Sequence, residues 1–353
     1  MRGGSTASVT LRDVALRVGV TPAAVSMALS GSTRISQATT ERIRAAAAEL
    51  GYVPSSAAKA LRRQRSDAIA LVVPNSSQHV FGHSYFMHVL TGVSAAANER
   101  DVQVLISTSA TEASGLTAYE RVMRSRSADG AIVTSAAIGD PNIGRLAASG
   151  LPVVLLGNYP DLPETTSVGW DDVSASRTVT EHLIVTHDRR RLLHVTGPLD
   201  HRTAVDRREG FLQAVKAHGL AGASAIVEGD FDEASGFDAV TGKRFAAAGF
   251  DGVVFANDDM AFGGLQALRR DGLSVPEDVA IVGFDDFGLS RTTDPGITTM
   301  HVQAEEVARI ATERLFALID ASQSAPTRDD LPVSLVCRAS CGCPRPDVVL
   351  SGS

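Results

Sequence analysis

Short apolar runs alternate with helical stretches along residues 67–284, and this series occurs twice. The first series has apolar runs at 68–73, 102–107, 130–134 and 153–156, separated by helical stretches near 85–100, 115–127 and 141–149. The second has runs at 191–195, 225–228, 252–255 and 280–284. Buried runs of this length between helices are typical of parallel sheets. The sequence therefore predicts two doubly wound α/β subdomains, with a cleft between them at the carboxyl ends of the strands.

Charge is distributed unevenly along the chain. Residues 1–66 hold ten Lys/Arg against three Asp/Glu, whereas the remainder holds 23 against 37. A basic head on an acidic body indicates that the head, and not the body, contacts a polyanion. The chain has no run of about 18 uncharged apolar residues, and no apolar run follows the arginine in MRGGSTASVTLRDVA. We therefore expect no membrane helix and a cytoplasmic location, associated with the nucleoid when bound to DNA.

The head contains three short helical signals. The first has apolar residues on one face and ends at Gly19, and the second begins at Pro22 with Thr21 as its cap. The third is capped by Ser36. A small residue at Ala15, a glycine four later and Val25 six later still are typical of an all-α helix-turn-helix, whose second helix enters the major groove. The alternative is a small helical bundle that does not bind DNA.

A basic segment follows Pro54 and reads SSAAKALRRQR. Alone, a helix of this length is marginal in water. Its basic residues and the single Leu61 suit a segment that orders on DNA, with phosphates neutralising the charges and leucine wedging into the minor groove. The alternative is a disordered basic linker.

The head, VTLRDVALRVGVTPAAVSMALSG followed by ISQATTERIRAAAAELGYVPSSAAKALR, resembles the lactose/galactose repressor family of bacterial transcription regulators. The resemblance covers about fifty-five residues without a break and includes the family's hinge helix. It implies that Pro22, Ala23 and Met27 face the bases and that Arg34 makes a further DNA contact. The positions that it assigns to the DNA backbone, the hinge and the minor-groove wedge are Thr10, Thr21, Ser26, Ser30, Thr39, Ser55, Lys59 and Leu61.

The three base-facing positions depart from the best-known members of that family. Pro22, Ala23 and Met27 offer no side-chain hydrogen bond to a base, although they can touch thymine methyl groups. We expect specificity to depend more on Arg34, on the kink at Leu61 and on the deformability of the DNA. The operator sequence is therefore left open.

Polar residues follow several strands of the predicted body. Asp285 and Asn257 come directly after apolar runs, and Arg207 opens a helical stretch. Carboxylates and a planar guanidinium can pair with the adjacent hydroxyls of a sugar, and Phe231 can supply a stacking face. Taken singly, each of these residues could instead be a helix cap, an ion pair or a core aromatic. The chain contains none of the motifs GxGxxG after a strand, GxxxxGKS/T, GxSxG or HExxH, which favours binding over catalysis.

Nearly all of the body also resembles the effector domain of the same family. The segments that carry this resemblance are GPLDHRTAVDRREGF, GDFDEASGF, VVFANDDMAFGGLQALRRDGLSVPEDVAIVGFDD and TTMHVQAEEVARIA. It implies a periplasmic-binding-protein-like fold, with His83-Ser84 standing where the family usually has Asn-Pro. The effector-binding residues that it implies are Tyr85, Phe86, Asp171, Arg207, Phe231, Asn257 and Asp285.

The predicted organisation has five parts: a helix-turn-helix at 9–54, a hinge at 55–66, a first subdomain of 67–168 with 302–330, a second of 169–301 with 331–340, and a tail at 341–353. We expect a repressor of sugar-utilisation genes that needs no cofactor. Its effector could instead be a nucleobase or nucleoside, and it could be corepressed or activating. A sugar enzyme with a DNA-binding head, an exported sugar-binding protein and an architectural DNA binder are the rival classes.

One helix-turn-helix reads only a few base pairs, so we expect a homodimer on palindromic double-stranded DNA. The residues after Pro344 lack the leucine heptads of a coiled-coil tetramer. Cys337, Cys341 and Cys343 cluster near this end, but no histidine neighbours them in sequence to complete a zinc site. The sequence prediction is therefore no metal, and a frayed tail with reduced thiols.

Overall fold

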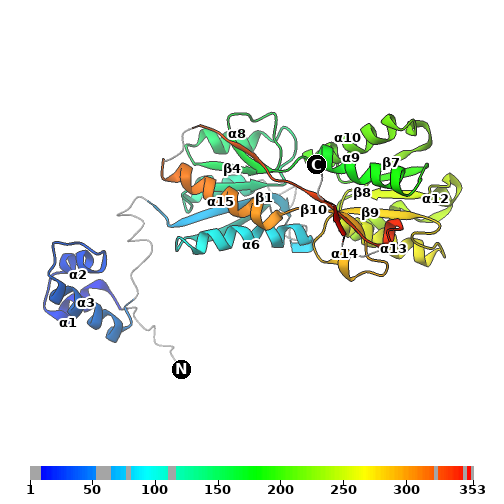
Figure 1. The fold of residues 1–353 in the computed structure, drawn as a ribbon. Coiled ribbons are helices and arrows are strands. Elements are labelled where there is room, and N and C mark those ends of the chain that lie inside the picture. Colours follow the sequence, from blue (N-terminus) through cyan, green and yellow to red (C-terminus); the bar gives the residue numbers. More distant parts are fainter. Residues whose placement is uncertain are drawn as a thin grey trace, which may run out of the picture. The chain divides into compact units, whose positions relative to one another are not determined.

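The computed structural model describes residues 9–52, 65–76, 81–109, 117–321, 325–344 and 348–350. The chain divides into two compact units, Met1–Ser66 and Asp67–Ser353, which are described separately below. Figure 1 gives the order of helices and strands along the chain. Among the described helices, none is both long and apolar enough to cross a bilayer.

The smaller unit consists of three helices, α1 (Leu11–Val18), α2 (Pro22–Leu29) and α3 (Gln37–Leu50). The Thr21 hydroxyl accepts a hydrogen bond from the Ala24 amide at 3.2 Å, which caps α2 ahead of its first-position proline. Gly19 ends α1 with a φ of 76°, a left-handed conformation that favours glycine. The helix-turn-helix fold expected from the sequence is confirmed.

Seven buried residues form the core of this unit: Val14, Ala15, Val25, Ala28, Ile43, Ala46 and Ala47. Small alanine side chains at the helix contacts let the three helices approach closely. An exposed ion pair between Arg17 and Glu49, 2.8 Å long, links α1 to α3. Because such surface pairs stabilise a fold by less than about 1 kcal/mol, the apolar core holds the unit together.

The first sheet of the larger unit has the strand order β11-β5-β4-β3-β1-β2, with every described pair parallel. Its strands are β1 (Ala68–Ser76), β2 (Gln103–Ser109), β3 (Ala131–Thr134), β4 (Val153–Leu156), β5 (Thr166–Gly169) and β11 (Arg328–Asp330). Helices α6 (Ser84–Asn98) and α15 (Ala304–Ile319) contact each other extensively, and both pack against one face of this sheet. Helices α7 (Ala118–Ser125) and α8 (Pro141–Ala148) cover the other face.

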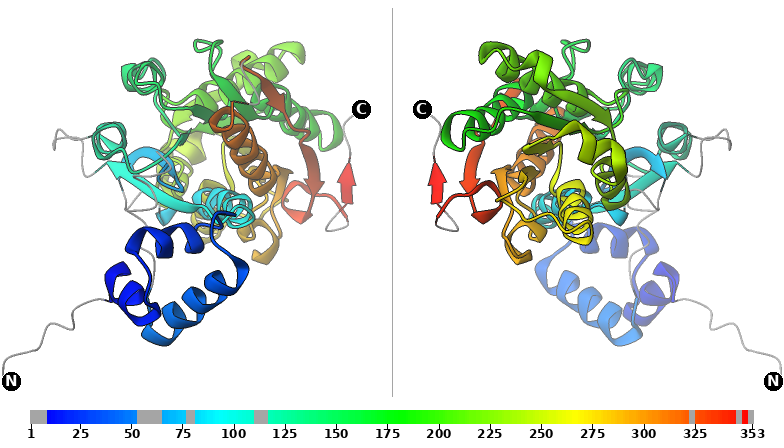
Figure 2. Two further views of the ribbon diagram at one scale, coloured as in Figure 1. Left: turned by 90° about the vertical axis from the view of Figure 1, so that its left-hand side faces the viewer. Right: turned by 90° about the vertical axis from the view of Figure 1, so that its right-hand side faces the viewer.

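The second sheet has the order β13-β12-β10-β9-β8-β6-β7. Its strands are β6 (Leu192–Thr196), β7 (Ala225–Glu228), β8 (Gly252–Phe255), β9 (Ala280–Asp285), β10 (Thr298–His301), β12 (Ser334–Cys337) and β13 (Val348–Leu350). Strand β12 is antiparallel to both of its neighbours, β10 and β13, and the other described pairs are parallel. The longer helices are α9 (Asp172–Glu181), α10 (Arg202–Ala217), α11 (Glu233–Ala239), α12 (Gly242–Ala248) and α13 (Asp258–Arg270), and α14 (Leu289–Thr292) is a single turn. Three short turns complete it: η1 (His182–Thr186), η2 (Ala221–Ala223) and η3 (Ala339–Cys341). The two views of Figure 2, which look at the molecule from its two ends, show helices on either side of the sheets.

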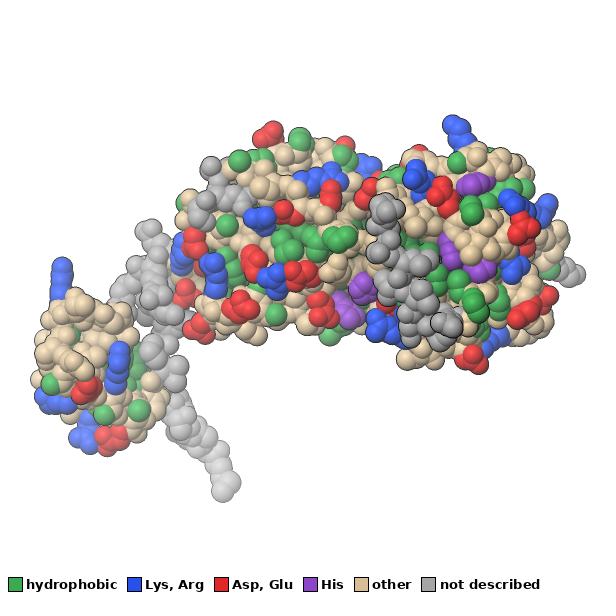
Figure 3. Space-filling model, in the orientation of Figure 1, with side chains coloured by type: hydrophobic (Ala, Val, Ile, Leu, Met, Phe, Trp, Pro, Cys, Tyr) green, Lys and Arg blue, Asp and Glu red, His purple; other side chains and the backbone are tan. Residues whose placement is uncertain are grey.

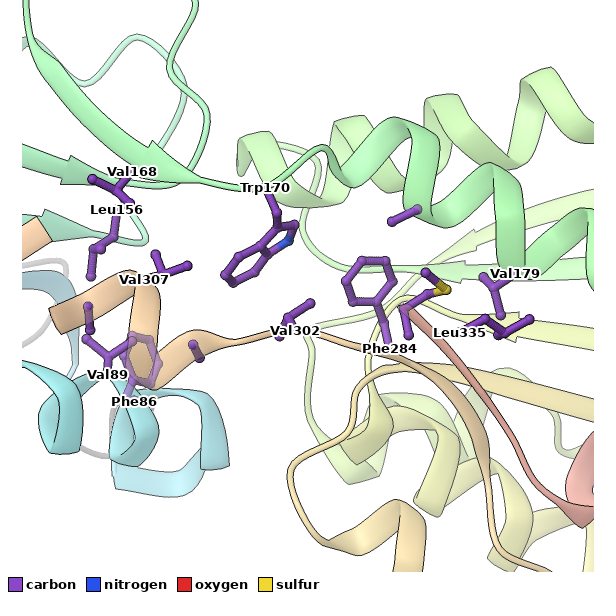
Figure 4. Packing of buried hydrophobic residues seen from close by; sticks show 14 of the residues in the cluster. Phe86, Val89, Leu156, Val168, Trp170, Val179, Phe284, Val302, Val307 and Leu335 are labelled. Carbon is purple, nitrogen blue, oxygen red and sulfur yellow. The ribbon is translucent and has the colours of Figure 1, made fainter. Parts of the chain in front are cut away.

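The chain crosses between the two sheets three times, after β5, after β10 and after β11. Buried apolar residues from both subdomains form one continuous cluster along these crossings. Figure 4 shows Trp170 and Val302 on two of the connecting segments, between Phe86 and Leu156 on one side and Phe284 on the other. The crossings are therefore packed parts of the fold and not loose tethers.

The predicted α/β body of two parallel-sheet subdomains is confirmed, but the tail prediction is wrong. Cys337 lies in β12, and Cys341 is fully buried in η3. Strand β13 then pairs with β12. The expectation of a frayed tail failed because short segments carry little periodicity, and their order comes from partners distant in sequence.

Candidate functional site

A hollow of about 850 Å³, open to solvent, lies between the two subdomains. The carboxyl ends of strands from both sheets border it, through Thr134 and Leu156 on one side and Asp285 on the other. Five aromatic residues line it: Tyr85, Phe86, Tyr159, Trp170 and Phe231.

Arg207 is the central charged group of this cavity and is 3% exposed. Its Nε donates to Asp172 Oδ1 at 2.7 Å, and its Nη1 donates to the carbonyl of Ala256. Its Nη2 lies 3.4 Å from Asp285 Oδ1. An arginine has five N–H groups, so the contacts named here leave two that a bound molecule can use.

The guanidinium of Arg207 also lies over Phe284, with its carbon 3.6 Å from the ring centroid. Carboxylates at its edge and an aromatic ring against its face fix the plane of the group. A fixed planar fork suits two adjacent oxygen atoms on one ligand. Arg207 is therefore pre-organised before any ligand arrives.

Asp285 ends β9 and is buried against Arg207. Burial raises the pKa of Asp285 to about 7, against the lowering effect of Arg207, and the nearby carboxylates Asp259 and Asp172 raise it further. Burial likewise raises the pKa of Asp172. Two buried carboxylates thus share one guanidinium, and a pKa of about 7 lets Asp285 hold a proton near neutral pH.

Asn257 and Phe231 hold each other in place. Asn257 caps α13 by accepting from the Met260 amide at 3.0 Å, and its Nδ2 donates to the Phe231 carbonyl at 2.7 Å. Phe231 has a φ of 59°, which is rare for a bulky residue and is maintained by this hydrogen bond. A Cβ at Gly197 would lie 2.1 Å from the Phe231 ring, so the aromatic ring needs a glycine beneath it.

The start of α6 supplies the opposite wall. Tyr85 and Phe86 contact edge to face with ring centroids 5.3 Å apart, and Tyr85 Oη lies 3.2 Å from Thr134 Oγ1. His83, where a different residue is usual in the resembling family, also lines the cavity. Its Nδ1 lies 3.5 Å from Asp259 Oδ2 of the second subdomain.

Asp171 is the one predicted effector residue that the structure places elsewhere. It is exposed and caps α9, accepting from the Ser174 amide at 3.0 Å. The next residue, Asp172, is buried, lines the cavity and also accepts from Trp170 Nε1 at 3.0 Å. The sequence prediction therefore needs a correction of one position, because a helix cap turns its side chain back to the helix and leaves the following residue to face the cleft.

Several cavity residues were missed from the sequence, notably Asp172, His201 and Arg202. The last two belong to a group of contacts that join the subdomains. Arg202 Nη2 donates to Asp161 at 3.2 Å, and the Ile138 amide donates to the Asp200 carbonyl at 2.7 Å. The polar residues that open α10 weakly indicate a site in the sequence. Their partners are distant in sequence, so the contacts themselves could not be predicted.

A second candidate surface lies on the head, where the predicted DNA-contact residues are accessible. Those that are exposed are Thr10, Thr21, Pro22, Ala23, Ser30 and Arg34, and those that are half-buried are Ser26, Met27 and Thr39. The N-terminal turn of α2 thus presents Thr21, Pro22 and Ala23 to solvent, while Val25 and Ala28 on its other face enter the core. Ser55, Lys59 and Leu61 lie outside the described residues.

Comparison with known proteins identifies the chain. Residues 10–55 match the model of bacterial regulatory proteins of the lacI family, and residues 180–341 match that of a periplasmic binding protein-like domain. The HTH-type transcriptional regulator CelR of Thermobifida fusca is 34% identical over 337 residues, which are 94% of this chain and 98% of that protein. The chain belongs to the LacI family of bacterial regulatory proteins.

Other members of the LacI family agree with this assignment. The HTH-type transcriptional regulator GntR of Pseudomonas aeruginosa is 31% identical, covering 95% of this chain and 96% of that protein. Among solved structures, a CelR–cellobiose complex has a TM-score of 0.71 at 30% identity, over 94% of this chain and 99% of that one. A lac repressor dimer bound to operator and an anti-inducer has a TM-score of 0.84 at 25% identity, over 95% and 99%. Like these relatives, the chain is a transcription regulator with a DNA-binding head.

The raised pKa of Asp285 predicts a pH dependence that Asp285→Asn removes. Between about pH 4 and 7 the folded protein retains a proton that the unfolded chain releases, so the stability of the wild type falls as pH rises through this window. The free energy of unfolding of the wild type, relative to Asp285→Asn, should therefore decrease by on the order of 2 kcal/mol between pH 5 and 8. Urea unfolding of both proteins at the two pH values measures this, and a constant difference would show that the carboxyl titrates normally.

Proposed function

We propose that the cleft binds a sugar, and that the bound sugar changes the affinity of the head for an operator. The observation that carries the sugar assignment is Arg207, buried with two N–H groups left for a ligand and flanked by aromatic walls. A sugar presents adjacent hydroxyls at its edge and apolar C–H groups on its faces. The hydroxyls can hydrogen-bond to a guanidinium and its carboxylates, and the C–H faces can stack on Phe231 and Trp170.

The open side of the cavity and the relatives refine this proposal. The hollow is open to solvent on one side, so a ligand longer than one sugar ring can extend out of it. The solved CelR structure is a complex with cellobiose, so we propose cellobiose and related disaccharides as the first ligands to test. A nucleoside is the alternative, since its ribose offers the same adjacent hydroxyls.

Contacts across the cleft are the means by which a bound sugar could change the operator affinity of the head. Arg202 with Asp161, and His83 with Asp259, join the subdomains at the mouth of the cavity. A ligand that changes these contacts would change how the subdomains close on each other. To alter operator affinity it must bind the two closure states with different affinities, by about 1–3 kcal/mol.

We propose that the regulator is a cytoplasmic homodimer that represses by occupying a palindromic operator, with no enzymatic activity of its own. The proposed DNA surface consists of base-facing Pro22, Ala23 and Met27, of Arg34, and of the backbone contacts Thr10, Thr21, Ser26, Ser30 and Thr39. It is extended by Ser55, Lys59 and Leu61.

On the face of the larger unit shown in Figure 3, Lys/Arg and Asp/Glu side chains are interspersed. That face lacks the single-sign field of a DNA-binding surface.

A thermal-shift screen of disaccharides, monosaccharides and nucleosides tests the ligand class. A ligand at about 100 times its Kd stabilises the folded state by about 2.7 kcal/mol, which should raise Tm by about 5 °C or more. We expect the hit to be a sugar, recovered unchanged after incubation. A nucleoside hit would reject the sugar assignment, conversion of the sugar would reject a purely binding role, and no hit would indicate a vestigial cleft.

A further inference from the structure

Five metal-binding side chains from two distant parts of the chain meet in the second subdomain. His182 and His187 border the turn η1, and Cys341 and Cys343 lie at η3, more than 150 residues later. Cys337, at the end of β12, is adjacent. The sequence prediction of no metal considered only histidines close to the cysteines, whereas the fold supplies two from afar.

The ligand atoms of four of these residues converge on one point. His182 Nε2 and His187 Nε2 lie 3.2 Å apart, and the nitrogen–sulfur distances are 3.4 Å from His182 to Cys341, 3.5 Å from His182 to Cys343 and 3.4 Å from His187 to Cys343. All four atoms lie within 4.8 Å of one another. Zinc bonds of about 2.0–2.3 Å give a tetrahedron with edges of about 3.3–3.8 Å. Four of the six edges are close to that range, and the other two are no longer than 4.8 Å.

We propose that His182, His187, Cys341 and Cys343 form a structural zinc site. Two imidazoles and two thiolates in a tetrahedron are the donor set that favours zinc among common divalent metals. Four protein ligands leave no open position for a substrate, so the site is structural and not catalytic. The spacing of the two histidines, with four residues between them, also matches that of zinc ligand pairs.

The surrounding backbone is shaped for this convergence. The turn η1 is a π-helix, a rare form that often marks functional sites, and it begins at His182. Gly342 has a φ of 103°, and a Cβ there would lie 3.2 Å from His187 Nδ1. A glycine between the two cysteines therefore lets both sulfurs approach the histidines.

The chemistry around the ligands is suited to a metal. Thr298 Oγ1 donates to Cys341 Sγ at 2.9 Å, as outer-shell groups do around zinc thiolates. Cys341 is fully buried, whereas half-buried His187 and Cys343 leave a path from solvent.

Zinc in this position would fasten the C-terminal segment to the end of α9. Helix α9 begins directly after a crossing between the subdomains, and the cysteines follow the last one. The metal would therefore stabilise the second subdomain by joining the C-terminal end of α9 to the segment after β12, and none of its ligands lines the effector cavity.

Cobalt binding to the reduced, chelator-treated full chain tests the proposal. We expect one Co²⁺ per chain, with the visible bands of tetrahedral cobalt and a thiolate-to-cobalt charge-transfer band, displaced by one equivalent of Zn²⁺. Zinc should also raise Tm. The double variant His187→Ala/Cys343→Ser should lose zinc affinity by more than about 100-fold.

Two controls separate ligand loss from misfolding. Cys337→Ser and the exposed His218→Ala should keep the cobalt spectrum. In the presence of chelator the double variant should have the same Tm as the wild type, and the two Tm values should differ only when zinc is added. The proposal is overturned if the reduced wild type binds no cobalt or zinc, if the cobalt is octahedral, or if the double variant binds as the wild type does. Cysteines that form a disulfide on purification and bind no metal once reduced would overturn it equally.

Discussion

Arg207→Ala is expected to eliminate the response to the effector. The substitution removes the fork that faces the ligand and leaves Asp172 and Asp285 buried without their counter-charge. Breaking this buried pair destabilises the fold by about 3–5 kcal/mol. Separately, each hydrogen bond that the charged guanidinium donates to the ligand contributes about 1.5–3 kcal/mol, so ligand affinity should fall at least about 10-fold. Isothermal titration with the ligand found by thermal shift measures the loss.

Two matched variants distinguish recognition from simple destabilisation. Arg207→Lys keeps the charge but not the planar fork, and should retain the fold while losing most of the affinity. Arg177→Ala removes a half-exposed arginine of α9 outside the cavity and should bind ligand like the wild type. If Arg207→Lys bound the sugar with undiminished affinity, the guanidinium geometry would have no role in recognition.

Val25→Asp is expected to abolish DNA binding and leave the effector cavity intact. Val25 is fully buried in the seven-residue core of the head, and an isolated buried carboxylate costs several kcal/mol. A helical unit of this size has little stability to lose, so the head should unfold. Operator affinity should then drop by about 1000-fold or more, to that of non-specific binding.

The larger unit should be unaffected by this change because the two units form separate compact bodies. The sugar-induced rise in Tm and the sugar Kd should therefore equal those of the wild type. Ala48→Asp adds the same charge at an exposed position of α3 and should keep operator binding. Wild-type operator affinity in Val25→Asp would mean that the three-helix head is not the DNA-binding element.

The regular parts of the fold were predictable because their periodicity is local. The apolar runs at 153–156 and 252–255 became β4 and β8 with their predicted bounds. Strands β5, β10, β11 and β13 were not among the apolar runs from which strands were predicted. Thr166–Gly169 and Arg328–Asp330 are not apolar, and each is a strand only because of its neighbours in the sheet.

The candidate site was predictable where a residue type and its place after a strand coincide. Asp285, Asn257 and Phe231 are in that class, and all three line the cavity. Arg207 lines it too, but it was expected to open a helix, whereas α10 begins five residues earlier at Arg202. Asp172 was missed in favour of Asp171 because the sequence does not reveal which of two adjacent aspartates caps the helix. The histidines of the proposed zinc site were missed because the fold alone brings them to the cysteines.

The central claim is that a ligand in the cleft controls how a paired helix-turn-helix binds DNA. The direct measurement selects binding sites from a random duplex pool with the purified full chain, then titrates the selected duplex by fluorescence anisotropy at several salt concentrations, with and without the sugar. We expect a palindromic site, an affinity that falls steeply with salt, and a change of about 5–150-fold in Kd when the sugar is added. A pool without a preferred palindrome, or a Kd that the sugar leaves unchanged, would contradict the account.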